Sequence, residues 1–360
     1  MTLRELNRAT LARQMLLARE KRPVVKAVGH LLGLQAQLPR PPFTGLWSRL
    51  EHFTRADLAT AVQARTVVRA TSMRGTIHLM TAADFLKFRG CLQPSLDAGL
   101  RAILRERMDT MDVPSLVAVA RAYFEQPHTF EDARDHLISK FPRGDERAMG
   151  YVARMVLPLV QVPSTDGWAY PAQADFVSAA SWLRKPIASC SVLGPIVLRY
   201  LAAYGPATVK DAQAWTGLAN LDATFAGLGD KLIAVAGPGG KPLFDLPDAP
   251  RPGADAVAPV RFLPEWDSVI VTRADERIVA KADRPRVFLS ALRVAALVLV
   301  DGMAAATWKV SATARKATLQ IDSFNTWPAA IRRDVTAEGD ALLRFVEPQA
   351  KTYEVKVATA

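Results

Sequence analysis

A unit of three helices followed by a short hairpin recurs along this chain, and the repetition constrains the fold more than any other feature. In two copies the second helix begins with the same pattern, Thr-x-x-Asp-Ala, at 129–133 and 208–212. The threonine of such a pattern caps the helix by accepting a backbone hydrogen bond. A hairpin with glycine in its turn is expected after each third helix, at 160–170 and 232–240. This order predicts tandem winged helices, with a helical array lacking wings as the alternative.

The amino-terminal region contains the same parts in a third copy. A capping box at Thr2 predicts a helix over 2–20, and Pro23 suits the first turn of a second helix over 24–34. Another cap at Thr54 is followed by two β-branched runs, 66–70 and 76–79, around a basic turn. The remaining helices of the three units are expected at 81–108, 116–124, 145–159, 193–204 and 221–228.

Beyond a Pro-rich linker at 247–259 the pattern changes to β-rich. Runs at 269–271 and 296–300 read as strands, and Asp301-Gly302 predicts a hairpin. The fold class is therefore predicted as α+β, with three tandem winged-helix units and a small β-rich C-terminal unit. The predicted boundaries are 1–110 for unit 1 with its connecting helices, 111–185 for unit 2, 186–250 for unit 3 and 251–360 for the C-terminal unit.

Charge and hydropathy narrow the partners. The 360 residues carry a formal charge of +11, which attracts a polyanion, although a basic protein without such a partner fits equally well. No membrane association is expected, because the most apolar stretch, 295–300, is far shorter than the roughly 20 residues of a spanning helix. The amino terminus also lacks the apolar segment of a signal peptide.

The two cysteines, Cys91 and Cys190, lie far apart in the sequence, so no disulfide and a reducing, cytoplasmic location are expected. Motifs for nucleotide phosphates, dinucleotides and zinc are missing from the sequence. His128 and His136 are too widely spaced for one helical metal face. The sequence therefore predicts neither a cofactor nor a metal.

A pair of amides, Gln35 and Gln37, stands where an apolar run ends at a proline-rich segment, 39–42. The prolines are expected to make the backbone extended, and in extended chain residues i and i+2 share a face. Both amides could then reach one small target. Most such pairs are simply solvated or bonded to nearby backbone groups.

Five stretches together resemble the AlkZ-like winged-helix DNA glycosylase family, and the resemblance covers essentially the whole chain. They are Met1-Thr2-Leu3-Arg4, Asn7-Arg8-Ala9-Thr10-Leu11, Leu34-Gln35-Ala36-Gln37, Arg74-Gly75-Thr76-Ile77-His78-Leu79 and Phe262-Leu263-Pro264-Glu265-Trp266-Asp267. One branch of this family carries Gln-apolar-Gln and another Gln-apolar-Asp, and Gln37 places this chain with the first. A known member of that branch protects an antibiotic producer from azinomycin crosslinks.

The resemblance implies a C-shaped arrangement of the three winged-helix units around a basic concave channel. It also implies a monofunctional glycosylase that removes N7-alkylated purines from double-stranded DNA, with Gln35 and Gln37 catalytic. Bulky adducts or interstrand crosslinks of a genotoxic natural product would be the lesions, and the role would be DNA repair or self-resistance. Arg40, Arg74 and His78 are candidate DNA contacts, against the alternative of a solvated basic turn and a histidine at the core edge. A monomer is expected. The alternative function is a non-catalytic winged-helix DNA-binding protein or transcription regulator, because winged helices are more often regulators than enzymes.

Overall fold

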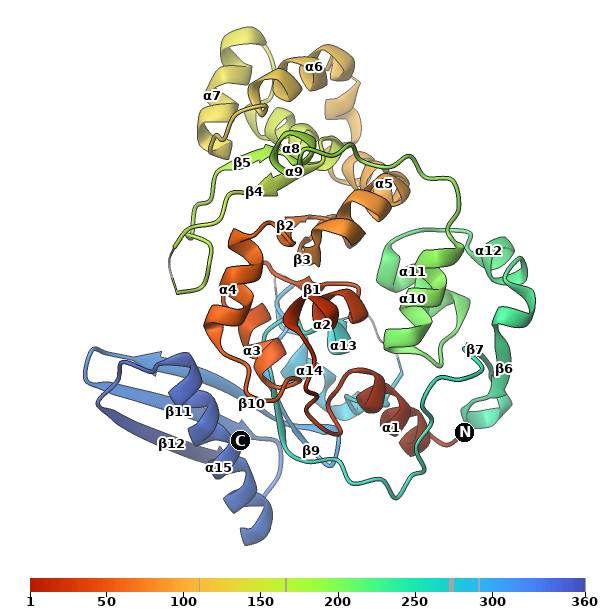
Figure 1. Ribbon diagram of the computed structural model, residues 1–360, viewed down its shortest axis with the longest axis vertical. Coiled ribbons are helices and arrows are strands. Elements are labelled where there is room, and N and C mark those ends of the chain that lie inside the picture. The colour runs from red at the N-terminus through yellow and green to blue at the C-terminus, as the bar shows by residue number, and fades with distance from the viewer. Residues whose placement is uncertain (110, 166, 272–274, 291, 360) are drawn as a thin grey trace.

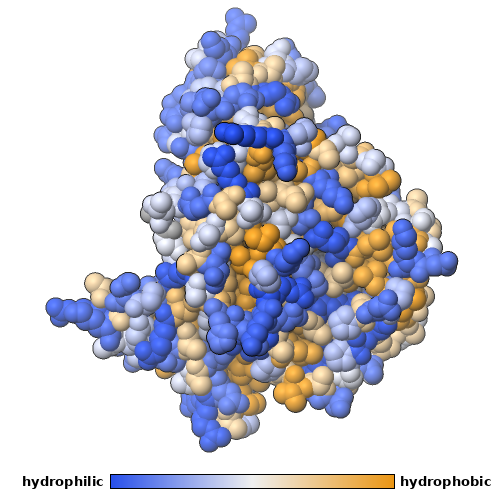
Figure 2. Space-filling view, viewed as in Figure 1, coloured by the Kyte–Doolittle hydropathy of each residue, from blue (hydrophilic) through white to orange (hydrophobic). Residues whose placement is uncertain are grey.

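The computed structural model describes residues 1–109, 111–165, 167–271, 275–290 and 292–359. Helices and strands are mixed along the chain, and the strands form two five-stranded sheets and a separate two-stranded hairpin (Figure 1). The predicted α+β class is confirmed. Hydrophilic side chains cover much of the face shown in Figure 2, and hydrophobic residues reach that surface in patches at its centre, on its right side and toward its lower edge. Within the described residues, no helix combines the length and apolarity needed to cross a bilayer.

Unit 1 begins with helices whose caps the sequence identified. Thr2 accepts from the Glu5 amide and Thr54 from the Asp57 amide, each within a complete capping box. The proline-rich segment was wrongly expected to be extended: Pro41 and Pro42 open a helix, where a fixed φ and a missing N–H are tolerated. The elements are α1 (Leu3–Arg13), α2 (Val24–His30), β1 (Leu34–Gln35), α3 (Pro41–Trp47), α4 (Arg55–Gln63), β2 (Val67–Thr71), η1 (Met73–Gly75) and β3 (Ile77–Thr81).

A long helix, α5 (Ala82–Leu104), leads from unit 1 into unit 2 with Pro94 inside it. Thr129 caps the second helix of unit 2, as predicted. The expected second strand was wrong: β4 pairs with 176–178, and the loop between them contains Trp168 and Tyr170, which pack on the unit 1 core. The expected Asp-Gly turn includes Asp166, which lies outside the described residues. The elements are α6 (Val113–Tyr123), α7 (Phe130–Lys140), α8 (Glu146–Val156), β4 (Leu159–Gln161), β5 (Phe176–Ser178) and α9 (Ala179–Leu183).

Unit 3 follows the predicted order closely. Thr208 and Asp211 form the capping box of its second helix, and Pro238–Gly240 forms the turn of its hairpin. Residues 246–260 contain no helix or strand, which agrees with the predicted linker. The elements are α10 (Gly194–Tyr204), α11 (Val209–Thr216), α12 (Asp222–Ala226), β6 (Ile233–Ala236) and β7 (Pro242–Asp245). Helices followed by a hairpin in the described part of each unit, four helices (α1–α4) in unit 1 and three each in units 2 and 3, are consistent with winged helices. The bounds of the four predicted units remain predictions.

The hairpins of units 1 and 2 belong to one sheet, of strand order β1-β3-β2-β4-β5. Ala70 on β2 pairs with Val160 on β4 and joins the two hairpins. Neither hairpin is therefore a free wing. The strand β1, which carries Gln35, lies at the edge of this shared sheet next to β3.

The C-terminal unit is a five-stranded sheet packed against a long helix, and its β9–β10 hairpin turns at Asp301-Gly302 as predicted. The prediction of a strand at 269–271 was wrong, because these apolar residues form a short buried helix. A buried helical turn and a buried strand have the same apolar sequence pattern. The elements are β8 (Arg261–Leu263), α13 (Ser268–Val271), α14 (Arg284–Val287), β9 (Leu297–Val300), β10 (Met303–Ala312), β11 (Lys316–Ser323), α15 (Ala329–Val346) and β12 (Thr352–Thr359).

Cys91 and Cys190 form a disulfide, with Cα atoms 4.6 Å apart, so the expectation of unpaired cysteines was wrong. The segment around Ala188 lies directly on α5, and its carbonyl would be 2.5 Å from a Cβ at Gly90. The Ala188 amide also donates to the Leu86 carbonyl, at 2.9 Å. This close approach brings together two cysteines that are 99 residues apart, and the expected reducing location loses its support from unpaired thiols.

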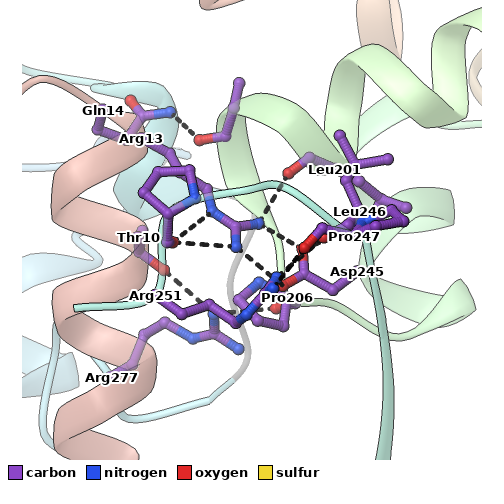
Figure 3. A network of polar contacts seen from close by, with 12 residues as sticks. Thr10, Arg13, Gln14, Leu201, Pro206, Asp245, Leu246, Pro247, Arg251 and Arg277 are labelled. Atoms are coloured by element: carbon purple, nitrogen blue, oxygen red, sulfur yellow. Dashed lines mark hydrogen bonds and ion pairs between the residues drawn. The ribbon is translucent and has the colours of Figure 1, made fainter. Parts of the chain in front are cut away.

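Helix α1 is fixed by buried charges that pair with the second half of the chain (Figure 3). Both guanidinium nitrogens of Arg13 contact the Asp245 carboxylate, at 2.6 and 2.9 Å, and both side chains are fully buried. Gln14 donates to the Ala203 carbonyl, at 2.6 Å. Arg277 donates to the Thr10 hydroxyl, at 3.1 Å. These contacts join α1 to unit 3 and to the C-terminal unit.

Candidate functional site

The two candidate catalytic amides contact one hairpin: Gln35 bonds the turn between β2 and β3, and Gln37 bonds the first residue of β3. The Oε1 atom of Gln35 accepts from Nη2 of Arg74, at 3.1 Å, and Oε1 of Gln37 accepts from the Ile77 amide, at 2.9 Å. Gln35 is 8% exposed, whereas Gln37 is half-buried. Both amides thus bond the same hairpin. Their position is set by the pairing of β1 with β3 and not, as expected, by the prolines.

Each glutamine retains hydrogen-bonding capacity for a ligand. One amide oxygen has two lone pairs, and the structure uses one of them for a protein donor. Among the described residues neither Nε2 atom has a hydrogen-bond partner, and neither side chain forms a hydrogen bond with a carboxylate. The residues that the structure describes contain no group of three His, Cys, Asp or Glu side chains placed to hold a metal ion. The arrangement can accept from water or a cation and donate through two N–H₂ groups.

Arg69 holds the backbone of the Gln35–Gln37 segment through two hydrogen bonds. Its Nε donates to the Ala36 carbonyl at 2.9 Å and its Nη2 to the Gln37 carbonyl at 3.0 Å. The third donor, Nη1, bonds the Gln161 side chain, so unit 2 contributes to the support. Burial is the main reason that the pKa of Arg69 falls to about 10, and the charge of Arg154 acts in the same direction.

Sequence reasoning missed Arg69 and Gln161. The signal in the sequence was a charged residue inside the β-branched run that became β2, where an arginine is buried only if its donors are satisfied. Arg69 is 4% exposed and Gln161 is 6% exposed. Their pairing depends on β2 and β4 being neighbours, which no local pattern indicates.

Arg74 was predicted to lie at an exposed basic tip, but its turn is packed between units. It donates to the Trp215 carbonyl on α11 as well as to Gln35, and burial lowers its pKa to about 10. Arg40 lies over the Trp168 ring, 5.0 Å from its centre, and pairs with Glu347. The DNA-contact roles of Arg40 and Arg74 remain predictions.

His78 lies opposite Gln35 on β3 and is 1% exposed, which leaves almost no surface for DNA in this structure. Its Nδ1 donates to the Thr76 carbonyl, at 3.1 Å. Burial lowers the pKa of His78 to about 3, and the nearby Arg74 charge adds to this effect. Its proposed DNA contact remains untested, and its visible role is that of a neutral core residue.

The buried His78 should make stability pH-dependent. The unfolded chain takes up this proton near pH 6.5 and the folded chain only near pH 3. Between these values the unfolded state binds more protons, so the free energy of unfolding falls as pH falls, by at most about 1.4 kcal/mol per pH unit. Urea denaturation from pH 7 to 4.5 should show a shallower slope for His78→Gln than for the exposed control His52→Gln. An equal pH dependence of the unfolding free energy in the two variants would contradict a buried, neutral His78.

The segment 262–267, which contributed to the family resemblance, has a structural role here. Asp267 pairs with Arg49 through two bonds of 2.8 Å, and both side chains are buried. Gly45 and Gln14 accept the remaining Arg49 bonds, at 2.9 and 3.2 Å. This pair fixes the end of α3 against the C-terminal unit, close behind the Gln35–Gln37 segment.

Comparisons with known proteins identify a family and a similar fold. The family model described as "DNA glycosylase AlkZ-like" matches residues 28–345. The structure is similar to Streptomyces sahachiroi DNA glycosylase AlkZ, with a TM-score of 0.81, 18% sequence identity, and coverage of 99% of this chain and 100% of that one. A search of curated proteins found no match. The chain belongs to the AlkZ-like DNA glycosylase family, which confirms the predicted enzyme class over a regulator.

Proposed function

We propose that this DNA glycosylase hydrolyses the N-glycosidic bond of cationic N7-alkylated purines, with Gln35 and Gln37 as its catalytic residues. The observation that supports the proposal most is that two neutral amides bond the same β2–β3 hairpin and that neither forms a hydrogen bond with a carboxylate among the described residues. A purine alkylated on a ring nitrogen already carries positive charge. Its departure as a neutral base therefore requires no general acid.

The remaining chemical task is to place water against the sugar carbon while positive charge develops there. The free lone pairs of the two amide oxygens can orient that water and face the developing charge. Arg69 keeps the backbone of the segment in place from the opposite side. In this proposal Gln35 and Gln37 touch the substrate, and Arg69 positions them.

The lesion that we propose is a bulky N7 adduct or an interstrand crosslink made by a genotoxic natural product, with repair or self-resistance as the role. The enzyme would act on double-stranded DNA as a monomer. Arg40 and Arg74 flank the glutamine segment and would contact DNA after exchange of their present protein partners. His78 is too buried to be part of this proposal.

Lesion choice tests the chemistry directly. Excision of an N7-alkylguanine should exceed release of uracil from the same duplex by at least about a hundredfold, because two amides cannot protonate a neutral leaving base. Single-turnover assays with alkaline cleavage of the abasic product measure both rates. Comparable release of the two bases would contradict the proposal, and a control duplex without a lesion sets the background.

A further inference from the structure

A cavity of about 470 Å³ opens between α7, α8 and the chain that leads into β5. It combines three arginines with amide and aromatic side chains, and one carboxylate lies at its border. Its lining includes Arg134, Arg147, Arg154, Tyr151, Gln161 and Glu131. The cavity also adjoins the candidate catalytic segment, because Gln161 lines it and bonds Arg69, which in turn holds the Gln37 carbonyl.

Two arginines beside this cavity, Arg154 and Arg69, have no counter-charge among the described residues. Arg154 donates to the Thr71 hydroxyl, at 3.3 Å, and Arg69 donates only to neutral oxygens. Neither forms an ion pair with a described carboxylate, whereas the buried Arg13 and Arg49 each have one. Two partly buried guanidinium groups that repel each other lower the stability of the folded protein unless an anion binds between them.

Other groups at the cavity favour an anionic ligand too. Arg147 is exposed, and Arg134 has a buried Nε atom without a hydrogen-bond partner. Arg134 pairs with Glu146 at 3.3 Å, which leaves it only partly neutralised. Burial lowers the pKa of Arg154, as expected for a cation that lacks a counter-charge. Guanidinium groups suit phosphate oxygens because they donate two parallel bonds.

We propose that this cavity binds a backbone phosphate of the DNA strand beside the lesion, with Arg154 as the inner ligand and Arg147 at the entrance. The proposal rests on the proposed function, since it needs DNA to lie across Gln37. A phosphate held here would fix the strand relative to the glutamine segment through the Gln161–Arg69 connection. Arg154 is thus a binding residue rather than a catalytic one.

Salt dependence of binding to undamaged duplex DNA tests the proposal without requiring excision. For Arg154→Gln the slope of log K against log salt should decrease in magnitude by about 0.9, the value of one phosphate contact. Arg154→Lys should keep most of the slope, because the charge remains. Arg121→Gln, which removes an exposed charge on α6 outside this cavity, is the matched control and should leave the slope unchanged.

Two outcomes would overturn the assignment: an unchanged slope in Arg154→Gln, or an equal loss in Arg154→Gln and Arg121→Gln. A second arm uses inorganic phosphate alone. Thermal stabilisation of the wild type by phosphate, combined with an unchanged DNA slope in Arg154→Gln, would assign the site to a free anion and contradict the DNA proposal. Because binding is measured on undamaged DNA, failure of the proposed lesion chemistry would leave these results readable.

Discussion

Replacing Gln37 with alanine should slow single-turnover excision of an N7-alkylguanine about 10²- to 10³-fold, the range found when one preorganised polar group is removed from an active site. The Kd for the same duplex should stay within about threefold. In the proposed mechanism Gln37 contributes its amide to the reacting centre, whereas its backbone is held by Arg69 and should remain in place. Gln35→Ala should have a similar effect.

A second variant separates catalysis from structure at this position. Gln37→Ala also leaves the Ile77 amide without its side-chain acceptor, a loss of about 1 kcal/mol for a typical hydrogen bond. Gln37→Glu keeps an oxygen for the Ile77 amide but removes the N–H₂ donor. If the donor matters for cationic lesions, Gln37→Glu should fold like the wild type and still change the excision rate.

The matched control is Gln126→Ala, which removes an exposed glutamine amide in the connection after α6. Its excision rate and Kd should equal those of the wild type within about twofold. Rates of Gln35→Ala and Gln37→Ala that match this control would remove both residues from the proposed mechanism. A parallel loss of DNA binding and rate would instead make them binding residues.

The largest effect on stability is expected for Asp245→Ala, at about 3–5 kcal/mol of unfolding free energy. The Asp245 carboxylate accepts two bonds from Arg13 and one from Arg251, at 2.7 Å. Arg13 is fully buried, so removal of its partner leaves an uncompensated charge inside the protein. Urea denaturation followed by circular dichroism measures the loss.

Two comparisons make this result specific. Asp340→Ala removes a carboxylate from the exposed pair with Arg344, which should cost only about 0.3–0.5 kcal/mol. The double variant Arg13→Met with Asp245→Leu should recover much of the loss, because the fully buried charge of Arg13 is removed together with its partner and only the partly exposed Arg251 loses an ion pair. Equal losses for Asp245→Ala and Asp340→Ala would show that the buried pair contributes no more than a surface one.

Local signals predicted local structure well. Thr2, Thr54, Thr129 and Thr208 all cap helices in the structure, because a cap depends on residues within one turn. The Asp301-Gly302 hairpin has the same origin. Gln35 and Gln37 were selected through their setting and the family resemblance. In the structure both bond the β2–β3 hairpin, and their catalytic role remains a prediction.

Features that depend on distant parts of the chain were missed. Strand β5 pairs with β4 across a loop of fourteen residues, so the nearer alternation around Trp168 was misleading. The Cys91–Cys190 disulfide depends on the segment near Ala188 approaching α5 at Gly90. Arg69 became part of the site only because two hairpins share a sheet. The number of residues between two positions does not show whether they are in contact unless the neighbouring strands and helices of the fold are known.

The contacts of α1 have a consequence for synthesis on the ribosome. Arg13 pairs with Asp245, and Arg277 donates to Thr10, so α1 emerges long before the residues that complete its bonds. Nascent unit 1 would expose unpaired guanidinium groups until more than half of the chain has been translated. Contacts of such long range are formed slowly. Assembly of this enzyme should therefore depend on chain completion, and its amino-terminal region should need protection from misfolding until then.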